Sequence, residues 1–356
     1  MHSHATYKQA TYKQATYKIT TEEKKSYMNH WSQYWKLSKA VNSFAEGSSA
    51  SGYHGDVEAF WQNELADLPK DAVIVDIGTG NGALAMLISE AGKKGKKNWQ
   101  VHGVDAAEID PVKALESKPE VAEKLKAITF HGNTDMTTLP FKDNSVDCVV
   151  SQFALEYGDG PTVVKEALRV LKPGGKLVAM VHHKKSELVK DSARGAEIFN
   201  HILNKTPLFM QADLLLRLGA LQMKNLSFAD WQKTQPFLAA TKTVEWIMHV
   251  VGEEFKSESD RVWLNDAFAR VIDVINTGRD EETAARAADW LTMTYDMLQG
   301  HRQRLEDQLN AAQTEAAVKK VLKTAEKESA ETTYNDFKTE DSLFAWTLRV
   351  VKSADS

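Results

Sequence analysis

The sequence predicts an α/β fold, a doubly wound Rossmann-like sheet with a large helical insertion before its last strands. Between residues 72 and 183, short apolar runs alternate with segments of helical periodicity, as expected of a parallel sheet that is covered on both faces. The first apolar run ends in the closely spaced glycines of VDIGTGNG, a turn typical of nucleotide-binding sheets. After residue 184 the pattern is helical until an apolar segment near 342–352.

The bulk composition excludes several classes of protein. A chain of 356 residues with 42% hydrophobic content can bury a large core. It contains no run of about 18 apolar residues and no apolar signal segment, so we expect a cytoplasmic protein with no membrane contact. The net charge of -5 gives no overall attraction to a phosphate backbone, and we expect no nucleic-acid partner. The single cysteine, Cys148 in VDCVV, is predicted to be a buried, inert thiol.

The chain before the first strand divides into two parts. Residues 1–20 carry the repeat ATYKQATYKQATYK, which is short and polar and is predicted to be disordered. Residues 21–70 show helical periodicity that is interrupted by EGSSASGYHGD, whose glycines indicate a loop. Helices around such a loop either form a lid over the neighbouring site or dock on the core, and the pattern leaves both open. The aromatic residues of this region are Trp31, Tyr34, Trp35, Phe44, Phe60 and Trp61.

Five apolar runs between residues 71 and 186 are predicted to form the strands of the α/β core. In chain order they are AVIVDIG, WQVHGVD, AITFHGN, VDCVVSQ and GKLVAMVHH. ALAMLISEAG and PTVVKEALRVL are predicted to be helices between them, and LKPGG is a turn that ends a helix and starts a strand. Residues 329–356 are expected to add the closing strands, with the strand signal in SLFAWTLRVVKS.

Residues 187–328 are predicted to be a helical insertion. DRVWLNDAFARVIDVINTG and EETAARAADWLTMTYDML each place apolar residues mostly on one helical face. We expect the insertion to lie over the strand ends as a substrate cap, with its large side chains around an apolar pocket. A homodimer interface is the other use of this surface. The side chains concerned are Trp231, Phe237, Trp246, Trp263, Phe268 and Trp290, with Met210, Met223, Met248 and Met293.

The glycine turn after the first strand fits two ligands. Read with Ala83, Gly78 and Gly80 form the G-x-G-x-x-A fingerprint of a dinucleotide site. Read from Asp76 to Gly82, the same stretch is the D-x-G-x-G-x-G turn that holds S-adenosylmethionine. A dinucleotide site places a pyrophosphate at a helix N-terminus, where an ionised Asp76 would repel it. A sulfonium with an ammonium group would be attracted, so Asp76 favours the cationic ligand.

Polar residues stand at the ends of the next three strands as well, and in an open α/β sheet these ends meet at one edge. Asp105 ends the second strand, where its carboxylate could accept hydrogen bonds from both hydroxyls of a ribose. Asp135 and Met136 follow the third strand and could hold the amine and the ring of an adenine. Ser151 and Gln152 end the fourth strand.

Four stretches in order carry a resemblance to a known family. VDIGTGNG, GVD, TDMTTLPFKDNSVDCVVSQFALEY and EALRVLKPGGKLV resemble class I S-adenosylmethionine-dependent methyltransferases of the broad bacterial small-molecule type. The resemblance covers about residues 40–183 and the closing strand near 342–352. It implies S-adenosyl-L-methionine as the cofactor and S-adenosyl-L-homocysteine as the product. The residues that it assigns to the cofactor are Asp76, Gly78, Thr79, Gly80, Gly82, Asp105, Ala106, Asp135, Met136, Ser151 and Gln152.

The chain departs from the family pattern at two places. Thr134 stands where glycine is common, and Glu156 with Tyr157 stands where many relatives have histidine. The second departure bears on the proton acceptor, for which the candidates are a histidine, at His182 or the adjacent His183, and Glu156 and Tyr157. Histidine, with an ordinary pKa of about 6.5, is the best base of the three at neutral pH. No metal site is expected at His182 and His183, because adjacent residues of a strand point to opposite sides.

Methyl transfer from a sulfonium is an in-line displacement that needs alignment, exclusion of water and at most one proton acceptor. The resemblance therefore implies a methyltransferase that acts on a small organic acceptor. A nucleic-acid methyltransferase is one alternative, disfavoured because the insertion mixes acids with its bases. A non-catalytic cofactor-binding or assembly protein with this fold is the other.

Overall fold

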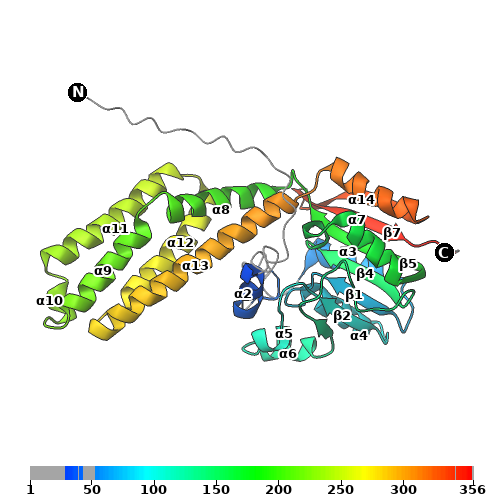
Figure 1. Cartoon of the computed structure of the whole chain (residues 1–356), viewed down its shortest axis with the longest axis horizontal. Helices are drawn as coiled ribbons and strands as arrows, with labels where there is room; N and C mark the ends of the chain where they lie inside the picture. The colour runs from blue at the N-terminus through cyan, green and yellow to red at the C-terminus, as the bar shows by residue number, and fades with distance from the viewer. Residues whose placement is uncertain (1–28, 39, 43–52, 341, 355–356) are drawn as a thin grey trace, which may run out of the picture.

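The structure is a computed structural model, and it describes residues 29–38, 40–42, 53–340 and 342–354. An α/β core carries a helical lobe that extends to one side of it (Figure 1). The predicted disordered repeat of residues 1–20 and most of the predicted lid loop lie outside the described residues.

A seven-stranded sheet forms the centre of the core. Its strands are β1 (Val73–Ile77), β2 (Gln100–Val104), β3 (Thr129–His131), β4 (Val146–Gln152), β5 (Leu171–His182), β6 (Glu331–Thr339) and β7 (Ser342–Val351). Their order is β3-β2-β1-β4-β5-β7-β6, with β1 to β5 parallel and β7 antiparallel to both β5 and β6. The chain runs outward on one side of β1 and then returns to pair β4 on its other side, so the crevice opens beyond the ends of β1 and β4. The predicted fold class is confirmed.

Helices cover both faces of the sheet, and each face has its own apolar core. The core helices are α3 (Gly55–Leu65), α4 (Ala83–Lys94), α5 (Pro111–Ala114), α6 (Pro119–Leu125), α7 (Gly160–Val170) and α14 (Glu315–Lys327). On one face Leu168 of α7 and Leu322 of α14 belong to the same cluster as the sheet residue Leu177. On the other face Trp61 of α3 and Ile88 of α4 belong to a second cluster, which includes the sheet residue Ile74. Cys148 is fully buried, as predicted, and burial raises the pKa of its thiol to about 12.

The helical lobe consists of six helices with a separate apolar core. They are α8 (Glu187–Asn204), α9 (Leu208–Gln222), α10 (Phe228–Trp231), α11 (Gln235–Glu254), α12 (Glu258–Thr277) and α13 (Glu281–Ala311). Capping boxes at Ser257 and Asp280 fix the starts of α12 and α13. Phe199, Leu216 and Leu291 are buried where the helices pack on one another. Because this core is internal to the lobe, the helices need no contact with the sheet to bury their apolar faces.

Two expectations about the insertion need correction. The range 187–328 includes α14, which packs against α7 and β6 of the core and not against the lobe. The lobe also does not lie over the strand ends, because α9 to α12 project away from the core (Figure 1). Only the end of α13 and the start of α8 approach the core, at α2 (Asn29–Leu37), at the 3-10 turn η2 (Leu155–Tyr157) and at β7.

The large side chains of the lobe are accordingly divided between its interior and its surface. Trp231, Phe237, Met223 and Met248 line a cavity of about 270 Å³ between the lobe helices, remote from the sheet. Met210, Trp246, Trp290 and Met293 are exposed. An apolar pocket exists as predicted, but it does not adjoin the strand ends.

The packing of α14 on the sheet can be tested with Leu322→Ala. Leu322 is buried in the cluster below α7, so removing its side chain should lower the free energy of unfolding of the core by about 2–5 kcal/mol. The midpoint of urea unfolding, followed by far-UV circular dichroism, measures the change. Lys323→Ala, at an exposed position of the same helix, is the matched control and should shift the midpoint little. Equal midpoints for the two variants would contradict this placement of α14.

Candidate functional site

The turn between β1 and α4 forms the floor of the site. The backbone N–H groups of Gly78 and Thr79 donate to the Val104 carbonyl at 2.7 and 3.0 Å, which ties the turn to the end of β2. Gly80 has a φ of +53°, in the left-handed region that favours glycine. A Cβ at Gly80 would also lie 2.4 Å from the indole of Trp35, so this position has no room for a side chain. The predicted turn is therefore both left-handed and closely covered.

Asp76 is a buried carboxylate directly beneath the turn. The hydroxyl of Thr79 donates to its Oδ2 at 2.7 Å. Burial raises the pKa of Asp76 to about 7, the Thr79 bond opposes this rise, and the nearby Asp105 adds to it. Tyr53 lies close enough to Asp76 for the carboxylate to raise the pKa of its phenol, after the larger effect of burial. An ionised Asp76 thus lacks a cationic partner among the groups that act on it, and a cationic ligand would supply one.

Asp105 joins the end of β2 to the same turn. Its Oδ2 accepts from the Gly80 N–H at 2.8 Å and its Oδ1 accepts from the Ala107 N–H at 2.8 Å. Burial raises the pKa of this carboxyl, and the two backbone bonds oppose the rise. Ala106 follows and is half-buried. The two carboxylates that the sequence singled out therefore lie beside one turn.

Asp135 and Met136 lie at the margin of this group. The Thr134 N–H donates to the Asp105 carbonyl at 2.9 Å, which fixes the loop after β3 next to the end of β2. Asp135 is exposed, and its Oδ1 accepts from the backbone and hydroxyl of Thr137 at 2.8 and 2.7 Å. Met136 is half-buried. The structure brings both residues to the correct edge of the sheet.

Ser151 and Gln152 differ in what they can offer a ligand. Ser151 is fully buried, its hydroxyl donating to the Ile77 carbonyl at 3.3 Å and accepting from the Leu155 N–H at 3.0 Å. Both bonds connect backbone segments. Gln152 accepts at its Oε1 from the indole N–H of Trp61 at 2.5 Å, while its buried Nε2 has no hydrogen-bond partner among the described residues. The Gln152 amide is thus the group with a donor to spare.

Glu156 and His182 form a buried pair beyond the ends of β4 and β5. Oε1 of Glu156 lies 2.6 Å from Nδ1 of His182 and accepts from the His182 backbone N–H at 2.7 Å. The His182 ring is stacked on Phe153 with centroids 4.3 Å apart, and Tyr157 meets it edge-on at 6.0 Å. His182, Glu156 and Tyr157 are therefore neighbours.

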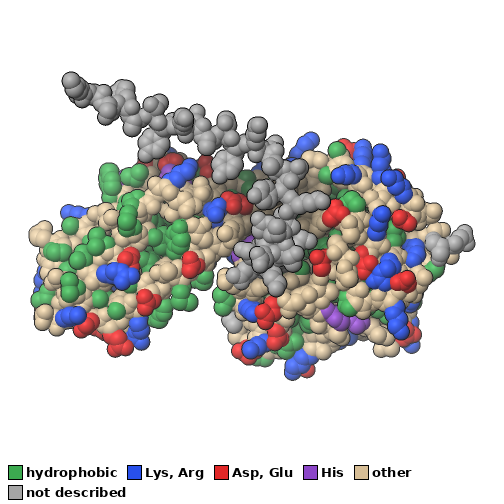
Figure 2. All heavy atoms as spheres, viewed as in Figure 1, with side chains coloured by type: hydrophobic (Ala, Val, Ile, Leu, Met, Phe, Trp, Pro, Cys, Tyr) green, Lys and Arg blue, Asp and Glu red, His purple; other side chains and the backbone are tan. Residues whose placement is uncertain are grey.

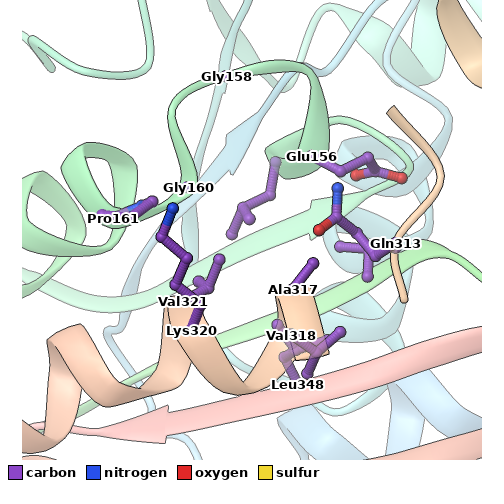
Figure 3. A pocket seen from close by; sticks show the side chains of 12 residues that line it. Glu156, Gly158, Gly160, Pro161, Gln313, Ala317, Val318, Lys320, Val321 and Leu348 are labelled. Carbon is purple, nitrogen blue, oxygen red and sulfur yellow. The ribbon is translucent and has the colours of Figure 1, made fainter. Parts of the chain in front are cut away.

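His183 points the other way, as predicted for adjacent strand residues. Its ring is stacked on Trp346 with centroids 4.2 Å apart. Glu156 also borders a cavity of about 180 Å³ between α7, α14 and the sheet, with Gln313 beside it and Lys320 near Gly160 (Figure 3). This cavity lies on the α14 side of the loop that carries Glu156.

Helix α2 covers the turn and was not among the predicted site residues. The side-chain amide of Asn81 donates to the carbonyls of Trp35 and Ala40 at 3.2 and 3.1 Å. At the start of α2, the ring of His30 and the indole N–H of Trp31 lie 2.7 and 3.0 Å from Oδ2 of Asp307, on α13. The sequence left open whether the aromatic residues before the first strand cover the site or dock on the core, and they do both. Trp35 covers the turn, and Trp61 docks on the core while holding Gln152.

The comparisons with known proteins agree with this geometry. Residues 75–179 match the protein family described as a methyltransferase domain. This similarity supports the expected class I, S-adenosylmethionine-dependent type and the expected cofactor. The buried Asp76 under a glycine-rich turn fits a cationic cofactor, with Asp105 available to a ribose.

Individual relatives align with about a third of this chain. Demethylmenaquinone methyltransferase from Bacillus licheniformis is 36% identical over 120 residues, which are 33% of this chain and 47% of that protein. An uncharacterized methyltransferase of Mycobacterium bovis is 29% identical over 109 residues, 29% of this chain and 37% of that protein. The chain spans about half the length of the first of these relatives and less of the second.

Among solved structures, a Haemonchus contortus phosphoethanolamine N-methyltransferase aligns with a TM-score of 0.34 at 23% identity, covering 46% of this chain and 34% of that one. A geranyl diphosphate methyltransferase aligns with a TM-score of 0.30 at 19% identity, covering 35% of this chain and 48% of that one. No described helix of the present structure is both long and apolar enough to span a membrane.

The environment of Asp76 predicts that cofactor affinity depends on pH. Because its pKa is about 7 without a ligand, Asp76 is mostly protonated at pH 6 and mostly ionised at pH 8. A cationic cofactor binds the ionised form better, so the affinity for S-adenosylmethionine should rise by about tenfold over this interval. Calorimetric titration at several pH values measures it.

Two variants accompany this titration. Asp76→Asn should weaken binding and remove the rise, whereas Asp71→Asn, at the other end of β1, should retain it. A rise that persists unchanged in Asp76→Asn would assign the titration to another group.

Proposed function

We propose that this protein transfers the methyl group of S-adenosylmethionine to a small organic acceptor. The observation that carries the proposal is the convergence at one sheet edge of a buried anionic floor, Asp76 and Asp105, with a polar wall, Gln152, Glu156 and His182. The first part suits a cationic donor and the second part suits an acceptor with a hydrogen-bonding group. The match to a relative named for its action on demethylmenaquinone supports a small-molecule acceptor for this chain.

The bound cofactor would supply an electrophilic methyl group on a good leaving group. The chain would align the acceptor with that methyl group and exclude water from the site. Asp105 is held by two backbone N–H groups, so its carboxylate is fixed before a ribose arrives. Trp61 fixes the amide of Gln152 with the oxygen turned toward the indole, which directs the Nε2 hydrogens elsewhere. Helix α2 and the aromatic rings around His182 exclude water from the same edge.

Where the acceptor must lose a proton, His182 is our candidate base. Glu156 accepts the Nδ1 hydrogen of the ring, and this selects the tautomer in which Nε2 carries the lone pair. Glu156 also stabilises the imidazolium that forms when Nε2 takes a proton. Tyr157, whose ring meets that of Trp31 edge-on with centroids 5.9 Å apart, is our candidate for contact with the acceptor and not for its activation.

The methyltransferase proposal is tested by incubating the protein with methyl-labelled S-adenosylmethionine and, separately, the small-molecule, protein and nucleic-acid fractions of a cell extract. We expect label in a small organic product. Asp105→Ala should weaken cofactor binding by roughly 10- to 100-fold, because it removes a charged acceptor. Asp71→Ala, the same change at the opposite edge of the sheet, should not. Cofactor binding without label transfer to any fraction would favour a non-catalytic protein, and transfer only to RNA or DNA would favour the nucleic-acid alternative.

The role of the Glu156–His182 pair is tested separately on the labelled product. His182→Ala should lower kcat by at least about 100-fold while leaving the dissociation constant of S-adenosylmethionine within about twofold. Glu156→Gln should lower kcat by a smaller factor and shift its pH profile. His183→Ala, one residue away but on the opposite side of the strand, is the control. A His182→Ala variant with an unchanged kcat would remove the base from the mechanism.

A further inference from the structure

The helical lobe carries most of the exposed apolar surface of the molecule. Apart from Leu37, every exposed large apolar side chain of the described residues lies on a lobe helix. These side chains are Met210, Leu214 and Leu221 on α9, Leu238, Trp246 and Val250 on α11, Val262 and Ile272 on α12, and Trp290, Met293 and Met297 on α13. Figure 2 shows hydrophobic side chains gathered over the lobe, while charged side chains are frequent on the core.

Helix α9 stands at the centre of this surface because it packs against both α11 and α13. Its exposed positions Met210, Leu214, Arg217 and Leu221 repeat every three or four residues, so they form one stripe along the helix. The opposite stripe, which includes Ala212, Leu215 and Gly219, is buried in the lobe. Helix α9 is therefore apolar on two faces, and the lobe itself explains only one of them.

We propose that this face of α9, with the flanking parts of α11 and α13, is the interface between two copies of this chain. The exposed apolar surface has the size that a dimer needs. The nine side chains on the three helices are each about half exposed, which amounts to roughly 900 Å² in all. A stable interface buries about 800 Å² on each partner, and the apolar patches of monomers rarely exceed about 600 Å².

The charges around the stripe favour a second copy over a lipid surface. Residues 187–311 contain fourteen Lys and Arg against nineteen Asp and Glu, so the net charge of the lobe gives no attraction to anionic headgroups. On α9 itself, Asp213 and Arg217 form an ion pair at 2.7 Å within the stripe. Both signs of charge are thus present beside the apolar residues, as a surface that pairs with itself requires.

A two-fold axis gives this pairing a specific geometry. If the axis crosses α9 between Leu214 and Arg217, the two α9 helices run antiparallel and Met210 of one copy faces Leu221 of the other. Leu214 then packs on the aliphatic stem of Arg217 from the second copy. Asp213 and Arg217 lie next to the axis, so each can pair across the interface as well as within its own helix. The strand ends of each copy stay open, because α9 projects away from the core (Figure 1).

The oligomeric state of the full chain tests this proposal, by light scattering after size exclusion and by sedimentation equilibrium. The wild-type protein should have twice the chain mass of 39.8 kDa. Leu214→Glu places an unpaired charge at the centre of the interface and should raise the dimer dissociation constant by at least about 100-fold. Val262→Glu, an equally exposed apolar position on α12 outside the three helices, is the matched control and should remain dimeric. Unchanged circular dichroism and S-adenosylmethionine binding verify that each variant is folded.

Charge exchange tests the antiparallel arrangement. Asp213→Arg alone and Arg217→Asp alone should each weaken the dimer, and the double variant should recover it because every opposite pair is restored. A wild-type protein that stays monomeric at about 100 µM would overturn the proposal, as would dissociation by Val262→Glu but not by Leu214→Glu. A monomer that floats with phosphatidylcholine–phosphatidylglycerol vesicles, with flotation lost in Leu214→Glu, would assign the face to lipid instead.

Discussion

The lack of room in the turn after β1 is the constraint on which the rest of the site depends. A Cβ at Gly78 would lie 2.1 Å from that of Ala154, and one at Gly80 would lie 2.4 Å from the ring of Trp35. A Cβ at Gly82 would lie 2.9 Å from the side chains of Leu125 on α6 and Phe130 on β3. Each glycine therefore allows a different segment to pack against the turn: the residues after β4 at Gly78, α2 at Gly80, and α6 with β3 at Gly82. A side chain at any of them would displace that segment and not merely strain the turn.

The close approach of these segments also sets the electrostatics of the site. Because the turn is covered, Asp76 and Asp105 are both buried, and burial is the main reason that the pKa of each carboxyl is raised. Two buried carboxylates at neighbouring strand ends repel each other's ionised form. Their bonds to Thr79, Gly80 and Ala107 recover only part of the lost solvation. The site is therefore organised to gain from a cation, which a neutral or anionic ligand would not provide.

Much of the core could be predicted from sequence because parallel strands buried on both faces are continuous apolar runs. VDCVVSQ was predicted as a strand and is β4, residue for residue. β6 lies within residues 329–356, where closing strands were expected, but its bounds were not located, because it is an edge strand with many polar residues, such as Thr332 and Asn335, and no apolar run signals it. The carboxylates Asp76 and Asp105 were found because their place at strand ends follows from the order of elements.

The location of the lobe could not be predicted in the same way. Amphipathic periodicity shows that a helix has a face to bury, but it does not show which surface covers that face. α9 to α13 each bury one apolar face inside the lobe, and periodicity does not show that α9 to α12 project away from the core instead of lying over the strand ends. Trp61 shows the converse limit. It is fully buried like any core residue, yet its indole N–H orients Gln152, and spacing alone does not separate these two roles.

Helix α2 is a short helix that contacts both the helical lobe and the cofactor turn of the core. At one end Asp307 of α13 receives both His30 and Trp31, and at the other end Trp35 rests on Gly80. Asp307 is buried, so losing both partners would remove two of the hydrogen bonds that offset the burial of its carboxylate. A movement of α13 would therefore carry α2 with it, and α2 cannot move without uncovering the turn. Since α13 also flanks the exposed face of α9, contact between two copies would constrain the same helix. The cover of the cofactor turn and the association of the lobes thus both involve contacts of α13.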